Sequence, residues 1–274
     1  MSAGNLNKDS YAKPWLSVSD QLARLANRGL QISNPEESES FLRHANYYRF
    51  AGYCLAFEQD RHRFRPGVTF EQVRRSYYFD ASLRDLMTEG LKVFEIDLRT
   101  TAVLNFGNVY GAFGQTEANN FRQRFDRQIS HGDWLKRLRA ETNRSRERFV
   151  KHFEHKYSQY PDLPVWAVTE VMSFGSLSRM IRGMHKRDRK EIAVIYNLSG
   201  RELSSAVLHL SYVRNLCAHH ARLWDRRWAI KFDLPSREPW KQTPVSNDRL
   251  FATVLLIWMM TEIRILFPLQ KMIT

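Results

Sequence analysis

The segment SYVRNLCAHHARLWDRR, residues 211 to 227, places Arg214, Asn215, His219 and His220 close together in a helical pattern. A guanidinium is a planar, permanently charged donor that suits a phosphate, and an imidazole can give or take a proton near neutral pH. Together they supply what RNA cleavage without a metal requires. A base removes the proton of the ribose 2′-hydroxyl, a cation steadies the charge on the phosphorane, and an acid protonates the leaving 5′-oxygen.

Helical geometry limits how these side chains can meet. Arg214 and His219 are five positions apart, about 140° around the axis of a regular helix, whereas Asn215 and His219 are one turn apart and share a face. Arg214 and His219 can therefore point at one phosphate only if the helix ends or tightens near His219, or if two copies of this helix meet in a composite site. The second arrangement predicts a homodimer.

Two other interpretations of these residues stay open. A buried arginine and asparagine can satisfy backbone or carboxylate groups, and a histidine near a helix C-terminus is favoured by the helix dipole. Cys217, His219 and His220 are also zinc-ligand types, but adjacent histidines point in different directions and no second ligand pair with suitable spacing is present. We therefore expect no metal and no cofactor.

A second charged pair, Glu95 and Arg99, lies one helical turn apart in the otherwise apolar segment FEIDLRT. As an ordinary i,i+4 ion pair it would stabilise a helix by a few tenths of a kcal/mol. Alternatively, Glu95 orients Arg99 or Arg214 toward a shared phosphate. The sequence does not separate these two roles.

The charge balance favours a polyanionic partner. The chain has 42 Lys and Arg against 29 Asp and Glu, a formal net charge of +13, which attracts nucleic acid first and anionic membrane second. The plainer alternative is a basic surface that only keeps the protein soluble. Basic residues gather at 133 to 157, at 185 to 190 and in RHRFR at 61 to 65, where an aromatic residue could stack on a base. The residues predicted to contact RNA are Arg137, Arg144, Arg148, Lys151, Lys186, Arg187 and Arg189.

The elements that carry these residues are all predicted to be helices, because apolar residues recur at three and four positions and no convincing alternating strand pattern occurs. Helices are expected from an N-cap at Ser19 to Gly29, over 33–57 with Pro35 at the first helical position, and from an N-cap at Thr69 to 106 as two helices bent near Phe79 and Asp80. Further helices are expected at 133–157, 164–174, 176–184, 187–197, 201–219 and 247–266, with an irregular connection over 222–246.

These elements predict an all-α chain in one compact unit overall. A flexible N-terminus at 1–14 precedes an N-terminal helical region at 15–68 packed on the core, and a helical domain follows at 69–274. Cys54 and Cys217 lie in apolar surroundings, as core residues in a reducing cytoplasm do.

The N-terminus lacks the apolar centre of a signal peptide, so a cytoplasmic location is expected. The apolar run at 250–269 is interrupted by Glu262 and Arg264, which favours a buried core helix over a membrane span. A membrane-associated protein is the minor alternative.

Five segments in order resemble the bacterial abortive-infection proteins of the Abi-like (AbiD/AbiF) group. They are KPWLSVSDQLARLANRGLQI, HANYYRFAGY, FEQVRRSYYFDASLRDL, FEIDLRT and YVRNLCAHHARLWDRR, and they cover the chain from about Lys13 to Arg227. Asp225 stands where relatives often have asparagine, which puts that local contact in doubt.

This resemblance implies a HEPN-like helical bundle with an N-terminal extension, and a metal-independent ribonuclease that acts as a dimer. It implies that Arg214 and His219 are the arginine and histidine of the R-x4-6-H motif and that Asn215 is the polar residue after the arginine, with Glu95, Arg99 and His220 in supporting roles. The setting it implies is phage defence or a toxin–antitoxin system. RNA would then be the substrate, and a structured antitoxin or regulatory RNA a further partner. The alternative function is a non-catalytic RNA-binding module in which the motif serves folding or dimerisation.

Overall fold

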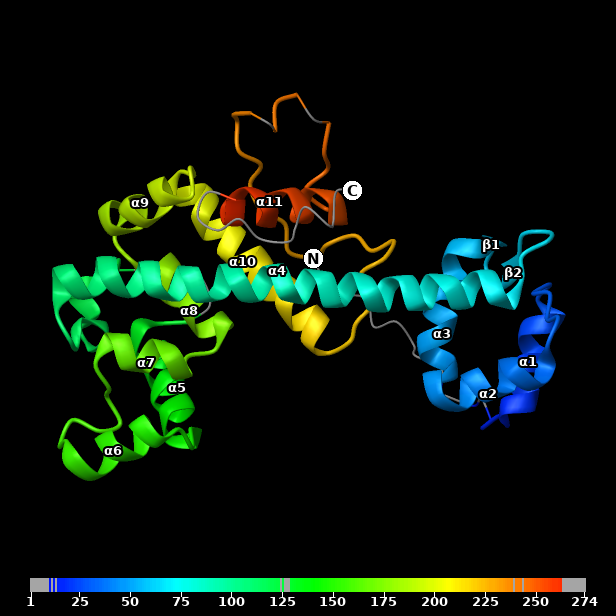
Figure 1. The fold of residues 1–274 in the computed structure, drawn as a ribbon, viewed down its shortest axis with the longest axis horizontal. Helices are drawn as coiled ribbons and strands as arrows, with labels where there is room; N and C mark the ends of the chain where they lie inside the picture. Colours follow the sequence, from blue (N-terminus) through cyan, green and yellow to red (C-terminus); the bar gives the residue numbers. More distant parts are fainter. Residues whose placement is uncertain are drawn as a thin grey trace. The chain divides into compact units, whose positions relative to one another are not determined.

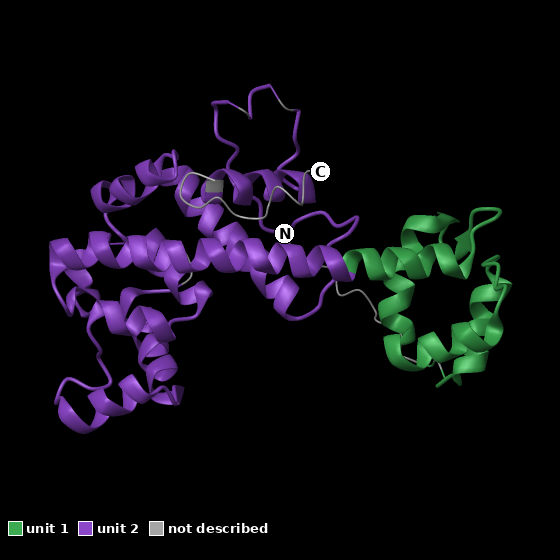
Figure 2. Cartoon of the chain, viewed as in Figure 1, with its two compact units in different colours: residues 1–80 green, residues 81–274 purple. Residues whose placement is uncertain are grey.

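A computed structural model describes residues 10, 12, 14–123, 125, 129–238, 240–242 and 244–262. The chain forms two compact units, residues 1–80 and 81–274 (Figure 2). Apart from one short two-stranded sheet, the regular structure of the described residues is helical, so the all-α prediction is confirmed. The units divide inside one helix, whereas the sequence prediction placed its boundary before that helix, between 68 and 69.

Unit 1 is built from short helices and a small antiparallel hairpin (Figure 1). In chain order it contains α1 (Val18–Asn27), α2 (Pro35–Ala45), α3 (Tyr47–Cys54), the 3-10 helix η1 (Leu55–Phe57), β1 (Glu58–Asp60), β2 (Arg63–Phe64) and the start of α4 (Phe70–Tyr110).

Local capping explains where the helices of unit 1 begin and end. The N-cap of α1 is Ser17, whose hydroxyl oxygen accepts from the Asp20 amide at 3.1 Å, so the prediction of Ser19 was wrong. Gly29, with φ 94°, ends that helix as predicted. The expected helix over 33–57 is broken at Asn46, which has φ 60° and caps α3. Its start at Pro35 is as predicted.

Helix α4 runs unbroken from Phe70 to Tyr110, so the prediction of two helices with a bend near Phe79 and Asp80 was wrong. The Asp80 carboxylate accepts a hydrogen bond from the Tyr53 hydroxyl at 2.6 Å. It is therefore held by tertiary structure and does not start a new helix. The predicted cap at Thr69 is confirmed, since its side-chain oxygen accepts from the Gln72 amide at 3.2 Å.

Unit 2 carries the rest of the helices (Figure 1). After α4 come η2 (Gly114–Thr116), η3 (Ala118–Asn120), α5 (His131–Arg144), α6 (Arg148–Lys156), α7 (Val165–Val171), α8 (Phe174–Gly183), α9 (Lys186–Ile195), α10 (Gly200–Ala218) and α11 (Leu250–Glu262). The part of the predicted last helix beyond residue 262 lies outside the described residues.

The single basic helix predicted over 133–157 is two helices, α5 and α6. Ser145 has an extended backbone, and its hydroxyl oxygen accepts from the Glu147 amide at 3.3 Å. Such a local side-chain bond competes with the helical backbone pattern and ends α5.

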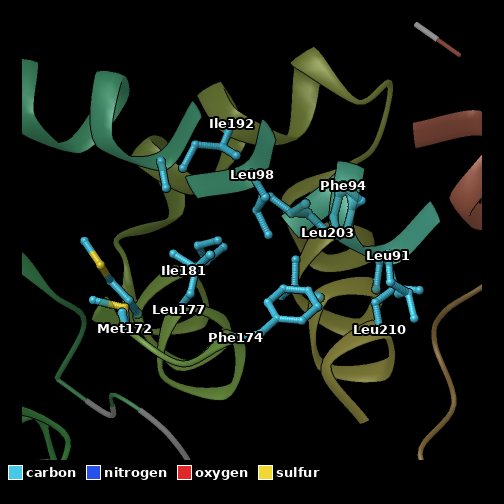
Figure 3. Packing of buried hydrophobic residues seen from close by; sticks show 14 of the residues in the cluster. Leu91, Phe94, Leu98, Met172, Phe174, Leu177, Ile181, Ile192, Leu203 and Leu210 are labelled. Atoms are coloured by element: carbon cyan, nitrogen blue, oxygen red, sulfur yellow. The ribbon is translucent and has the colours of Figure 1, made fainter. Parts of the chain in front are cut away.

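A single apolar core fixes α4, α8, α9 and α10 within unit 2, and Figure 3 shows its centre. The labelled residues are Leu91, Phe94 and Leu98 from α4, Phe174, Leu177 and Ile181 from α8, Ile192 from α9, Leu203 and Leu210 from α10, and Met172 before α8. Because the buried positions of α4 recur every three or four residues, Glu95 and Arg99 lie beside the core stripe rather than opposite it.

Candidate functional site

Helix α10 ends just before the predicted catalytic histidine. His219 is the C-cap, and its amide donates to the Asn215 carbonyl oxygen at 3.0 Å. His220 has φ 53°, its amide donates to the Cys217 carbonyl oxygen at 2.9 Å, and the Ala221 amide donates to the Leu216 carbonyl oxygen at 2.8 Å. This is the Schellman pattern of helix termination. Of the two arrangements left open by the spacing, the helix does end at His219, and the His219 side chain is exposed.

The Glu95 carboxylate lies between two arginines and joins α4 to α10. One oxygen contacts Arg99 Nη2 at 2.5 Å, and the other lies 3.6 Å from Arg214 Nε. Arg99 also donates to the Thr169 carbonyl oxygen. The side chains of Glu95 and Arg99 are 12% and 13% exposed, whereas that of Arg214 is 43% exposed. Arg99 is thus held inside the fold, and Arg214 is steadied at Nε while other donors of its guanidinium can face a ligand.

Arg214 and Asn215 lie on the wall of a cleft of about 1400 Å³ in unit 2. One stripe of α10 forms a side of this basic cleft, through Arg201, Ser204, Leu208, Ser211 and Asn215. Because α10 packs against α8, Arg179 and Arg182 of α8 lie on the same wall. Arg137 of α5, Arg189 of α9, and Arg122 and Lys231 from irregular segments complete the basic lining.

The lining of the basic cleft is strongly cationic. Among the described residues, the lining contains eight Arg and Lys side chains and one carboxylate, Asp233, which pairs with Arg201 at 2.9 Å. Small-molecule pockets measure roughly 300 to 1,000 Å³ and are mostly apolar. This cleft is larger and is lined by arginines and serines, so it suits an extended anion better than a compact apolar ligand.

Several buried polar atoms on the cleft wall have no hydrogen-bond partner among the described residues. They are Ser178 Oγ, Arg189 Nε and Tyr212 Oη. Buried polar groups in native proteins are nearly always paired, and an exception points to water or a ligand. Orphaned donors on this wall therefore fit a ligand-binding surface.

The predicted RNA-contacting residues divide into two groups. Arg137 and Arg189 line the basic cleft, and Arg144 lines a neighbouring cavity of about 550 Å³ together with Arg137. Arg148, Lys151, Lys186 and Arg187 line neither cavity. Lys151 pairs with Glu154 at 2.6 Å, and Arg187 lies 3.3 Å from Asp188.

The aromatic residue in the basic segment 61–65 is not available for stacking. Phe64 is buried in unit 1, and Arg65 donates to the Ala56 carbonyl oxygen at 2.7 Å. The expected stacking role was wrong, because strand β2 turns this ring into the unit 1 core.

Sequence reasoning missed Arg122, Arg179, Arg182, Arg201 and Lys231. Arg179 and Arg182 are three positions apart on α8, and Arg201 starts the polar stripe of α10 that Ser204 and Ser211 continue. Such polar stripes on helices whose other face is apolar could have identified them. Arg122 and Lys231 lie outside helices, where the sequence carries no comparable signal.

The remaining histidine of α10 faces the core. His209 is fully buried, with Nδ1 2.6 Å from the Ile230 carbonyl oxygen and Nε2 2.9 Å from Thr253 Oγ1. Burial lowers the pKa of His209 to about 4. It is therefore a neutral structural residue that ties α10 to the segments around Ile230 and Thr253.

The zinc interpretation gains no support from the geometry. Cys217 is buried, whereas His219 and His220 are exposed. Over the described ranges no cluster of three or more histidine, cysteine or carboxylate side chains is placed to hold a metal ion.

No helix in the described part of the chain has the length and apolar character needed to cross a bilayer.

The chain was compared with known families and proteins. A model of the family described as Abi-like protein matches residues 40–225, a span that contains Glu95, Arg99, Arg214 and His219. No curated protein and no solved structure matches the chain. Because the matched span covers well over half of its length, the chain belongs to the Abi-like protein family.

Proposed function

We propose that this protein is a HEPN-type endoribonuclease that cleaves RNA without a metal ion. Membership of the Abi-like family indicates abortive infection, that is, phage defence. The observation that carries the proposal is the position of Arg214 and Asn215 on the wall of the basic cleft, on the helix whose end exposes His219. The cleft would bind the RNA backbone, and the end of α10 would act on one phosphate. Within phage defence, the activity could be that of a free-standing abortive-infection effector or of a toxin restrained by an antitoxin.

In the proposed reaction the ribose 2′-oxygen attacks the adjacent phosphorus, so that the O2′–P bond forms and the P–O5′ bond breaks. The 2′-hydroxyl proton goes to a base, and an acid gives a proton to O5′. Arg214 stabilises the charge on the phosphorane, and Asn215, one turn before His219, fixes the geometry. The products are a 2′,3′-cyclic phosphate and a 5′-hydroxyl.

His219 serves as the acid or the base of this reaction. One turnover needs both, so we expect the second imidazole to come from His219 of a partner copy, in a homodimer with a composite site. His220 is secondary in this scheme, because it forms the turn that ends α10.

The test uses purified protein and cellular RNA in the presence of EDTA. Wild type is compared with Arg214→Ala, His219→Ala and, as a charge-matched control in unit 1, the exposed Arg24→Ala. Circular dichroism verifies folding, and the cleaved ends are mapped. We expect Arg24→Ala to cleave like wild type, and Arg214→Ala and His219→Ala each to lose about 100-fold or more of the cleavage rate. Cleavage only with added divalent metal, or undiminished cleavage by His219→Ala, would show the mechanism to be wrong.

A second candidate function is a non-catalytic module that holds a structured RNA. The observation that favours it is that the residues lining the basic cleft include Arg214 and Asn215 but not His219. It predicts salt-sensitive RNA binding without turnover, and equal RNA affinity for wild type and His219→Ala.

A further inference from the structure

Arg122, Arg182 and Arg189 lie close together in the wall of the basic cleft. Arg189 Nη1 donates to the Arg182 carbonyl oxygen at 3.0 Å, which ties α9 to the end of α8. The Arg122 amide donates to the carbonyl oxygen of Gly183, the residue after Arg182, at 3.0 Å. The three guanidinium groups thus come from segments that are bonded to one another.

Two arginines of this cluster, Arg122 and Arg189, donate to uncharged groups. Arg122 Nη2 donates to the Phe125 carbonyl oxygen at 3.3 Å, so the bonds of Arg122 and Arg189 run to neutral carbonyl groups. Burial lowers the pKa of Arg189, and the charges of Arg122 and Arg182 lower it further. Arg189 Nε is buried without a hydrogen-bond partner among the described residues. Like charges held together in this way are stabilised by a bound anion.

The cluster lies at the start of α10, whereas Arg214 lies near its end. Arg189 Nε would be 3.5 Å from a Cβ atom placed on Gly200, the first residue of α10. Arg214 follows fourteen positions later on the same helix, which corresponds to about 21 Å along the axis. The polar stripe of α10 continues the cleft between these two points.

We propose that Arg122, Arg182 and Arg189 form a phosphate subsite that anchors the RNA backbone about six nucleotides from the phosphate bound at Arg214, at the roughly 3.4 Å rise of a stacked strand. The inference rests on the proposed function in one respect, that the ligand of the cleft is RNA. A free phosphate ion would occupy only a small part of a cleft of about 1400 Å³, so the cavity fits a strand that spans both ends. The subsite sets a minimum length for RNA that binds well.

The experiment measures binding of labelled single-stranded RNAs of about 3, 6, 9 and 12 nucleotides by fluorescence anisotropy. All proteins are full length and carry His219→Ala, so the RNA is not cut by the proposed reaction and the result does not depend on catalysis. Arg189→Gln and Arg122→Gln are compared with Lys190→Ala, which removes one positive charge from an exposed position of α9. Arg122 is exposed, so its variant keeps the test valid if Arg189→Gln fails to fold.

We expect affinity to rise steeply between about 3 and 9 nucleotides. Each arginine variant should weaken binding of the longest RNA about tenfold but that of the shortest less than about threefold. For the longest RNA, each should reduce the slope of log affinity against log salt by about 0.7, the loss of one phosphate contact on a single strand. Lys190→Ala should change the slope much less.

Affinity independent of RNA length, or arginine variants that behave like Lys190→Ala, would overturn the proposal. Inorganic phosphate is titrated as a separate probe. If it binds wild type but not Arg122→Gln while leaving the longest RNA bound, the cluster is a site for free phosphate and the RNA anchor is wrong. Length-dependent binding by a protein that does not cleave RNA would remove the proposed mechanism but leave this anchor standing.

Discussion

Substitutions at Glu95 and Arg214 separate the role of Arg214 in folding from its role in the proposed chemistry. Glu95 and Arg99 form a largely buried pair, at 12% and 13% exposure. Removing one partner of a buried pair costs about 3 to 5 kcal/mol of unfolding free energy. Glu95→Gln should lower the unfolding free energy by about 3 kcal/mol, the lower end of this range, because Arg99 keeps its bond to the Thr169 carbonyl oxygen.

Arg214→Ala should cost far less stability. Its side chain is 43% exposed, and its 3.6 Å contact with Glu95 is an ion pair too long for a hydrogen bond. Such pairs contribute about 0 to 1 kcal/mol. If Arg214 serves catalysis, its substitution abolishes activity at nearly unchanged stability, whereas Glu95→Gln lowers both.

The assay is thermal unfolding followed by tryptophan fluorescence in a Trp15→Phe background. Trp15 is the one tryptophan of residues 1–80, so the signal then reports unit 2, where Trp134 and Trp228 are buried. At about 2 to 4 °C per kcal/mol for a unit of this size, Glu95→Gln should lower the Tm by about 6 to 12 °C and Arg214→Ala by at most about 4 °C. Equal Tm losses for the two variants would refute this reasoning and assign Arg214 a structural role.

Two further predictions concern the surroundings of α10 and the cleft. The pKa of His209 is lowered to about 4 from an ordinary 6.5. Between these two pH values the imidazole of His209 is mostly protonated in the unfolded chain and mostly neutral in the folded chain, so acid favours unfolding. Unit 2 should therefore lose about 3 kcal/mol as pH falls from about 6.5 to 4, and His209→Gln should flatten this profile; a wild-type stability that is level over the same range would contradict it. A Cβ on Gly183 would lie 2.4 Å from the Phe125 ring, so Gly183→Ala should cost about 1 to 3 kcal/mol in urea unfolding and, by displacing the segment that holds Arg122, weaken RNA binding. An unchanged urea midpoint would show that Phe125 can move aside.

The helical nature of the chain could be predicted from its sequence, but the breaks between helices could not. Pro35 at the start of α2 and Gly29 at the end of α1 act through their own backbone preferences, and both were placed correctly. The break at Ser145 depends on a side chain bonding locally instead of facing solvent. The continuity of α4 through Asp80 depends on Tyr53, which is distant in sequence.

The candidate site was predictable where one helix carries it. Arg214, Asn215 and His219 were identified from their types and spacing, and Glu95 was recognised as a residue that could orient Arg214. The contact between Glu95 and Arg214 joins α4 to α10, so only packing could establish it. The basic cleft was not predictable, because it assembles arginines from α5, α8, α9 and α10 with Arg122 and Lys231 from irregular segments.

Helix α10 serves the core and the candidate site with different faces. Leu203, Leu210 and Val213 are buried in the core, while Arg201, Ser211 and Asn215 line the basic cleft. Because the core fixes this helix, the distance between its two ends is also fixed, and so is the spacing between the proposed phosphate anchor and Arg214. Arg122 and Lys231 lie on irregular segments, but their neighbours Phe121, Phe125 and Phe232 are buried in the same core. In the proposed enzyme, therefore, both the chemistry and the phosphate anchor rest on segments that the core holds in place.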